Sequence, residues 1–181
     1  MGYTQEDCLR DTKEHITQVR KFMLMFAEEL TQRALVHDQS KLKSPELEIF
    51  TEYTPKLKES TYGSREYKEF LKEMKVALKH HYSNNSHHPE HYTKYVCNGC
   101  FSEYNEKPDK CYGCGYSQLQ EESDIAQMDL ADIVEMICDW KAATLRHNDG
   151  DIRESIDINK DRFKYSDDLH EIFHNTVKMF D

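Results

Sequence analysis

Four cysteines in the middle of the chain form two CxxC pairs. Cys97-Asn98-Gly99-Cys100 is followed, after ten residues, by Cys111-Tyr112-Gly113-Cys114. Two such pairs supply the four thiolates of a tetrahedral structural zinc site, and four thiolates leave no open position for water. We interpret the glycine inside each pair as the residue that lets the chain turn tightly. The sequence therefore predicts a structural zinc held by Cys97, Cys100, Cys111 and Cys114.

A second group of chemically suggestive residues lies nearer the N-terminus. The apolar run Ala34-Leu35-Val36 ends in the adjacent pair His37-Asp38. An imidazole beside a carboxylate can ligate one divalent cation, while the carboxylate bridges to a second. His15 lies upstream and shares a helical face with apolar residues at positions 19, 22 and 26, so we expect it to point inward.

These residues resemble the HD-domain superfamily of metal-dependent phosphohydrolases. The hallmark of that superfamily is a His, then His-Asp after apolar residues, then a distant Asp. The segment Ala-Leu-Val-His-Asp-Gln-Ser-Lys at 34–41 looks like the family's apolar-His-Asp-x-Gly/Ser-Lys segment. The resemblance implies an all-α bundle in which His15, His37 and Asp38 hold a first metal with the closing Asp. Asp38 would bridge to a second metal, and Lys41 would meet a phosphate oxygen.

The closing Asp of the resemblance has two candidates. Asp139 matches the family's apolar-Asp-x-Lys/Arg ending best, and its neighbours Ile137 and Trp140 belong to the apolar side of the predicted helix. Asp132 is the second candidate, because Asp129, Asp132 and Asp139 form a carboxylate stripe at helical steps. The alternative interpretation of this stripe is a solvated acidic face.

Five of the ten histidines lie between residues 80 and 91. Members of the HD superfamily with two metals take two further His from this part of the chain, and our choices are His80 and His88. His81 is assigned to proton transfer toward the leaving group. His81, His87 and His91 remain alternatives as ligands, as groups that support the ligands or as proton-transfer groups, because spacing cannot separate the five imidazoles. A His-rich surface loop is the non-functional alternative.

A motif near the C-terminus also attracts notice. His170-Glu171-Ile172-Phe173-His174 fits the HExxH pattern of zinc metalloproteases. Only seven residues follow it, so the usual downstream third ligand has no place, and the helix carries an ordinary apolar packing stripe. We therefore interpret the motif as structural.

Two longer segments are similar to those of a family of small uncharacterised proteins of bacteria and their phages. They are HHxxxxxHHPEH at 80–91 and CDWKAATxRHNDGD at 138–151. In the second segment Arg146 and Asn148 are candidates for substrate contact, although Arg146 would equally complement the dipole of a helix C-terminus.

Helical periodicity and capping residues predict an all-α fold. Thr4 begins a first helix that reaches about residue 30, with a second helix or a continuation to 36, and Ser44-Pro45-Glu46 begins the next. Further helices are predicted at about 64–82, from a Ser123-Asp124 cap to 148, at 151–164, and after a cap at Ser166. Residues 83–122 lack periodicity. We predict a single HD-like helical bundle over 1–181, with a zinc-ribbon or zinc-knuckle module inserted at 95–117.

Composition limits the classes of protein and partner. The net charge of −10 disfavours binding to duplex nucleic acid or to an anionic membrane, since both require a basic surface. No apolar run approaches the roughly 20 residues of a membrane-spanning helix, and Met1–Glu6 has no basic and apolar leader. We expect a cytoplasmic protein, in which the paired cysteines are ligands rather than disulfides. Cys8 and Cys138 stand apart from them and are predicted to be buried.

The predicted core is thin. The mean hydropathy is −0.88, and Leu, Ile, Val and Phe together make up about a fifth of the chain. We therefore expect the zinc and the His/Asp centre to contribute folding free energy.

The leading hypothesis is a metal-dependent phosphohydrolase that acts on a nucleotide or related phosphate ester. It would use one or two catalytic divalent cations (Mn, Fe, Co, Mg or Zn) and a small phosphate-containing substrate. One alternative is a di-iron HD-type oxygenase, and another is a non-enzymatic zinc-containing module that binds a protein partner. The sequence leaves the substrate and the oligomeric state open.

Overall fold

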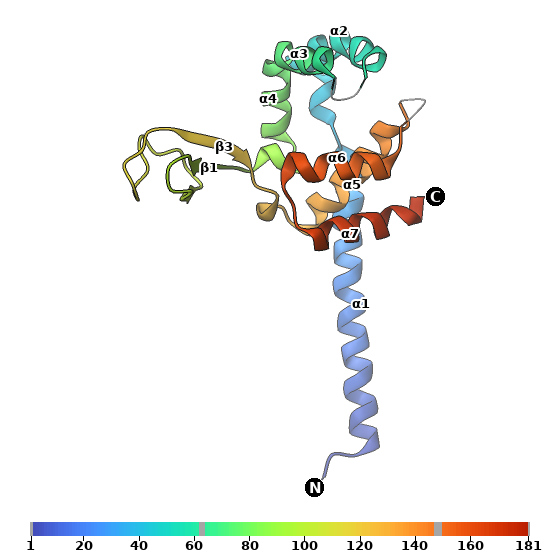
Figure 1. Cartoon of the computed structure of the whole chain (residues 1–181). Helices are drawn as coiled ribbons and strands as arrows, with labels where there is room; N and C mark the ends of the chain where they lie inside the picture. The colour runs from blue at the N-terminus through green and yellow to red at the C-terminus, as the bar shows by residue number, and fades with distance from the viewer. Residues whose placement is uncertain (1, 62–63, 147–149, 181) are drawn as a thin grey trace. The chain divides into compact units, whose positions relative to one another are not determined.

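The computed structural model describes residues 2–61, 64–146 and 150–180 (Figure 1). Helices account for 67% of these residues and strands for 7%, so the expectation of a mainly helical protein is confirmed. The chain divides into two units, Met1–His37 and Asp38–Asp181. Among the described residues, no helix combines the length and the apolar character needed to cross a membrane.

The first unit is one helix, α1 (Gln5–Val36). Thr4 caps it as predicted, because its hydroxyl accepts a hydrogen bond from the amide of Asp7 while the Asp7 carboxylate accepts from the Thr4 amide. The predicted continuation to residue 36 is present without a break. None of the residues of α1 is buried, and Cys8 is exposed rather than buried as we expected. His15, which we expected to point inward, is exposed.

The second unit contains the remaining helices. The α-helices are α2 (Glu46–Glu59), α3 (Arg65–Glu73), α4 (Lys75–Asn84), α5 (Leu130–Thr144), α6 (Ile152–Phe163) and α7 (Asp167–Thr176). Short 3-10 helices are η1 (Gln39–Leu42), η2 (Pro89–His91), η3 (Ile125–Gln127) and η4 (Val177–Phe180). The cap predicted at Ser166 is confirmed, and Asp151 caps α6 in the same way, since the side chain of each accepts a hydrogen bond from an amide in the first turn.

Two predicted helix boundaries were wrong. The helix expected at 64–82 is broken at Met74 into α3 and α4, and the break lets both pieces pack against α2 while Met74 itself is buried. The helix expected from Ser123 begins instead at Leu130, because Ser123 is paired in a strand and Asp129 supplies the cap. 

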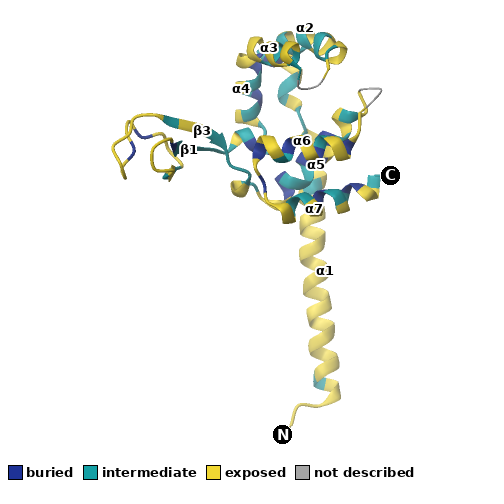
Figure 2. Ribbon diagram, in the orientation of Figure 1, coloured by how far each residue is buried: buried dark blue, intermediate teal, exposed yellow. Residues whose placement is uncertain are grey.

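The apolar core lies among α5, α6 and α7, whose facing sides carry the buried residues (Figure 2). The Trp140 ring stacks on Phe163, with 6.2 Å between ring centroids, and meets Phe173 edge-on at 5.8 Å. Ile137 and Trp140 are buried as predicted. Leu130 and Leu145, at the two ends of α5, are exposed, and Cys138 is exposed rather than buried as predicted.

The inserted segment is a small antiparallel sheet rather than an irregular loop. Its strands are β1 (Thr93–Cys97), β2 (Glu103–Tyr104) and β3 (Leu119–Ser123), in the order β2-β1-β3. The register places Thr93 opposite Ser123 and Cys97 opposite Leu119. The first CxxC pair begins at the last residue of β1, and the second lies in the connection between β2 and β3.

Candidate metal centres

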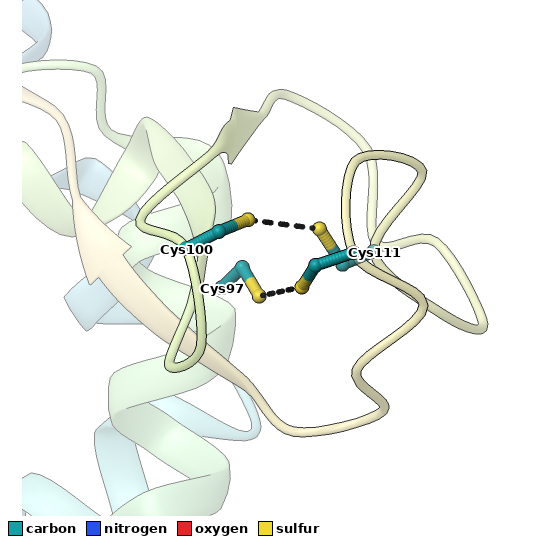
Figure 3. A group of neighbouring side chains, drawn as sticks. Cys97, Cys100 and Cys111 are labelled. Carbon is teal, nitrogen blue, oxygen red and sulfur yellow. Dashed lines mark hydrogen bonds between the residues drawn. The ribbon is translucent and has the colours of Figure 1, made fainter.

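The four predicted cysteines converge in the inserted sheet (Figure 3). The sulfurs of Cys97 and Cys114 are 3.6 Å apart, and those of Cys100 and Cys111 are 3.4 Å apart. A disulfide would bring two sulfurs to about 2.05 Å. A tetrahedral zinc with Zn–S bonds of about 2.3 Å separates its sulfurs by about 3.8 Å. The donor set and the spacing of the sulfurs therefore fit zinc.

The two CxxC turns have the same backbone hydrogen bonds. The amide of Phe101 donates to the carbonyl of Cys97 at 2.9 Å, and the amide of Gly115 donates to the carbonyl of Cys111 at 2.8 Å. Phe101 and Gly115, each directly after the second cysteine of its pair, have positive φ values of 61° and 74°. The left-handed residue therefore follows each pair, rather than lying within it as we interpreted from the sequence.

The glycines inside the pairs serve another purpose. A Cβ at Gly99 would lie 3.4 Å from the sulfur of Cys114, and one at Gly113 would lie 3.3 Å from the hydroxyl of Ser102. Both contacts are tight, so these glycines keep room for the groups that converge on the sulfurs.

Hydrogen-bond donors around the sulfurs favour thiolates. The Tyr104 hydroxyl lies 3.1 Å from the sulfur of Cys111 and lowers the pKa of that thiol to about 5. The Ser102 hydroxyl and amide likewise lower the pKa of Cys100. Because the thiolate is the metal ligand, these donors prepare Cys100 and Cys111 for a cation. Cys114 differs: a backbone hydrogen bond at Tyr116 lowers its pKa, but the neighbouring Cys100 and Cys97 thiols raise that pKa to about 12.

A second group of possible ligands lies in the second unit, and it combines one carboxylate with three imidazoles. Atoms of Asp38, His81, His87 and His88 lie within 4.8 Å of one another. His81 Nε2 and His87 Nε2 are 3.4 and 3.6 Å from Asp38 Oδ1. His81 Nε2 is also 2.8 Å from His88 Nε2. Asp38 precedes η1, His81 lies on α4, and the other two follow α4.

Carboxylates support two of these imidazoles from behind. His81 Nδ1 is 2.9 Å from Oε2 of Glu46, and His87 Nδ1 is 3.1 Å from Oε1 of Glu135. Glu46 is completely buried, and both imidazoles are at most 2% exposed. Metal-ligating histidines commonly donate their second ring N–H to a carboxylate in this way, which fixes the tautomer and turns Nε2 toward the ion.

The charges of this buried group favour a divalent cation. Burial lowers the pKa of His81, and burial together with the neighbouring His87 and His81 lowers the pKa of His88 to about 2, so both imidazoles are neutral. Four acidic side chains, Asp38, Asp139, Glu46 and Glu135, lie at or beside this group. Lys41, whose Nζ is 2.5 Å from Asp38 Oδ2, brings one positive charge. Buried charge is costly unless it is compensated, and a divalent ion would balance the excess.

The structure brings together only part of the set chosen from the sequence. Asp38 and His88 lie in this group, and Lys41 lies beside it. His81, assigned to proton transfer, and His87, held as an alternative, both have Nε2 in the group. His80, chosen as a ligand, is not part of this group. Its Nδ1 bonds Glu46 Oε1 at 2.7 Å and its side chain is 40% exposed.

His91 is also outside this group, since its Nδ1 lies 2.7 Å from the carbonyl oxygen of Tyr82. His15 and His37 belong to the first unit, where His37 is the C-cap of α1 and is joined to Asp38 by a peptide bond. Asn148 lies outside the described residues, and Arg146 follows the end of α5.

The two candidate closing aspartates have different surroundings. A carboxylate oxygen of Asp139 lies within 4.8 Å of one of Asp38. Asp132 instead accepts hydrogen bonds from Ser86 at 2.5 Å and from Tyr92 at 2.8 Å, and it forms the capping box of α5 with Asp129. Asp132 thus fixes the His-rich loop to α5, and Asp139 is the carboxylate near the imidazoles.

Sequence reasoning missed Glu46 and Glu135 completely. Both occupy ordinary helical positions, where acidic residues are common, and only the approach of an imidazole distinguishes them. A single sequence does not distinguish a buried glutamate in the first turn of a helix from the exposed acidic residues that are common there.

Comparison with known protein families gives one finding. Residues 4–180 match the model of a family described as "Family of unknown function (DUF5662)". No significant match was found among curated proteins or among solved structures. Because the family model covers nearly the whole chain, the protein belongs to the DUF5662 family.

Proposed function

We propose that this protein is a metal-dependent phosphohydrolase acting on a nucleotide or a related phosphate ester. One observation carries the proposal. A carboxylate oxygen of Asp38 and the Nε2 atoms of three histidines face one another, and two of the three imidazoles have a buried or nearly buried carboxylate on the opposite nitrogen. The resemblance of the segment around Asp38 to HD-type hydrolases supports the same chemistry.

In this centre some residues would bind the cation, and Lys41 would neutralise negative charge on the phosphate. A divalent cation held by Asp38, His81, His87 and His88 would supply Lewis acidity toward a phosphoryl oxygen and would lower the pKa of a bound water. Lys41 pairs with Asp38 Oδ2, so its ammonium group is available beside the ligands to neutralise charge that develops on phosphate oxygens. Because His81 Nε2 lies in the group, we now assign His81 as a ligand rather than as the proton donor.

Asp139 supports a site for a second cation. Its carboxylate lies close to that of Asp38, and a carboxylate with two oxygens can bridge two ions. Two acidic groups this close repel each other when both are ionised, and a cation between them would remove that repulsion.

Adjacent histidines give the test a matched control. His80 and His81 both bond Glu46, but only His81 has a nitrogen in the group. We expect His81→Gln to weaken metal binding by about 10- to 100-fold. Hydrolysis of a panel of nucleotides and phosphate esters with added Mn²⁺ or Co²⁺ should fall at least as far. His80→Gln should stay within a few-fold of wild type in both assays.

Metal analysis of aerobically purified wild-type protein separates the alternatives. Phosphohydrolase activity restored by Mn²⁺, Co²⁺ or Mg²⁺ supports the proposal. Two irons per chain with visible absorption, and no hydrolysis, would favour the di-iron oxygenase, since a site rich in His and carboxylate also suits iron. If the protein holds a single zinc per chain, and His81→Gln and His80→Gln have the same metal affinity and activity, the results would favour the non-enzymatic zinc module.

A further inference from the structure

A third cluster of metal-binding side chains lies on α6 and α7, on residues outside the proposed active centre. It consists of Asp157 on α6 and of His170 and His174, one helical turn apart on α7. Both imidazoles approach the same carboxylate oxygen, Asp157 Oδ1, with their Nε2 atoms at 2.8 and 3.0 Å. The two Nε2 atoms are themselves 3.2 Å apart.

Hydrogen bonds explain two sides of this triangle but leave the third side unexplained. The Nε2–H groups of both imidazoles can donate to Asp157 Oδ1, but the two Nε2 atoms, 3.2 Å apart, are then both donors with no acceptor between them. A tetrahedral zinc with bonds of about 2.0–2.1 Å separates its nitrogen and oxygen ligands by about 3.3 Å. The observed triangle needs to open by only a few tenths of an ångström to accept an ion.

The two helices hold these side chains on a rigid base. The residue between the two histidines on the inner face of α7 is Phe173, which is 1% exposed, and Ile156 beside Asp157 is completely buried. The ring of buried Tyr165 lies 6.4 Å from that of His170 at an interplanar angle of 30°, and the Tyr165 hydroxyl donates to the carbonyl of Ile156 at 2.6 Å. The packing of the core thus fixes the distance between the helices that carry the three ligands.

We propose that Asp157, His170 and His174 form a transition-metal site, separate from the four-cysteine group and from the Asp38 centre, that links α6 to α7. Two imidazoles and one carboxylate select Zn²⁺, Ni²⁺, Co²⁺ or Cu²⁺ over Mg²⁺ and Ca²⁺. The side chain of Asp157 is 60% exposed, so solvent or another ligand completes the coordination sphere. Glu171, the acid of the HExxH pattern, is exposed and is not among the three converging residues, so the site differs from that of a metalloprotease.

The test is a Zn²⁺ titration by calorimetry on full-length protein that retains its tightly bound zinc. The variants are His170→Gln/His174→Gln and Asp157→Asn, each compared with wild type and with His91→Gln, which removes an exposed imidazole elsewhere. We expect wild type and His91→Gln to bind one more equivalent of Zn²⁺ than the double histidine variant. Asp157→Asn should bind that equivalent at least tenfold more weakly.

A second measurement tests the link between the helices. Saturating Zn²⁺ should raise the midpoint of thermal unfolding of wild type, and the double histidine variant should lose that part of the rise, because an ion that binds only the folded state stabilises it. The same titration on His88→Ala keeps this proposal apart from the proposed function, since the additional equivalent must survive loss of the other centre. Should the double histidine variant fail to fold, Asp157→Asn, which changes one exposed side chain, decides the question by its affinity.

If wild type and Asp157→Asn bind the same number of Zn²⁺ ions with the same affinity, Asp157 is not a ligand and the proposed site is wrong. If His88→Ala loses the additional equivalent of Zn²⁺ while the double histidine variant keeps it, that ion belongs to the Asp38 centre. This result would also overturn the proposal.

Discussion

Glu46 has no exposed surface and uses its two carboxylate oxygens for different histidines. Oε1 binds His80, which stays outside the metal-binding group, and Oε2 binds His81, which joins it. Glu46 thus contacts both neighbouring imidazoles through their Nδ1 atoms, and of the two only His81 has its Nε2 close to Asp38 and His88. Sequence reasoning identified the His-rich segment but chose His80 over His81 as a ligand, because nothing in the order of residues reveals which of two adjacent imidazoles has its Nε2 near Asp38.

A substitution of Asp132 tests whether this carboxylate stabilises the fold through its hydrogen bonds or binds a metal ion. Asp132→Asn replaces one acceptor oxygen by an N–H₂ group that faces donors from Tyr92, Ser86 or the backbone, so we expect a loss of about 1–3 kcal/mol of unfolding free energy in urea. The metal content should stay the same. Asp129→Asn is the control, because Asn caps helices as well as Asp and should cost little. A variant of Asp132 that keeps its stability but loses a metal ion would contradict this role.

At the scale of elements, local signals were sufficient for most helix starts. Thr4 and Ser166 cap α1 and α7 as predicted, and α6 begins close to its predicted start, with Asp151 as its cap. The sheet was missed because β3, Leu-Gln-Glu-Glu-Ser, has no apolar alternation and depends on pairing with β1. The break at Met74 was missed because apolar residues continue at helical spacing through it, and only packing against α2 requires the change of direction.

The CxxC turns allow a prediction about backbone conformation. Gly115 has φ of +74°, and no atom lies within 4 Å of the place where a Cβ would be, so Gly115→Ala adds backbone strain without a clash. A left-handed residue with a Cβ costs roughly 1–2 kcal/mol, which corresponds to about a tenfold loss of zinc affinity. Competition with a chromophoric chelator measures the loss. Gly115→Asn should fall between Ala and wild type, because Asn tolerates this conformation better; an Ala variant as tight as wild type would refute the argument.

At the scale of the whole molecule, we expect that the four-cysteine sheet of the second unit can lose its structure without unfolding the core of α5, α6 and α7. The apolar core of α5, α6 and α7 includes no residue of the sheet at 93–123. We therefore expect Cys111→Ser to remove zinc and to raise amide hydrogen exchange across the sheet, while exchange in those three helices and the far-ultraviolet circular dichroism change little. Cys138→Ser, at an exposed cysteine outside the group, should leave both unchanged.

Global loss of helical structure in Cys111→Ser would show instead that the zinc supports the entire unit. That outcome would agree with the sequence-based expectation of a fold that depends on metal throughout. The structure narrows this expectation, since it places the thiolates and the core of α5–α7 in different elements.

The buried interior of the second unit contains an unusual share of polar groups. Glu46, His81, His87, Asp132 and Asn159 are as buried as the aromatic side chains around Trp140. Exposure of apolar surface raises the heat capacity on unfolding, whereas exposure of polar surface lowers it. The heat-capacity increase of this unit is therefore reduced relative to a purely apolar interior of the same size, and its free energy of unfolding varies less steeply between cold and warm temperatures.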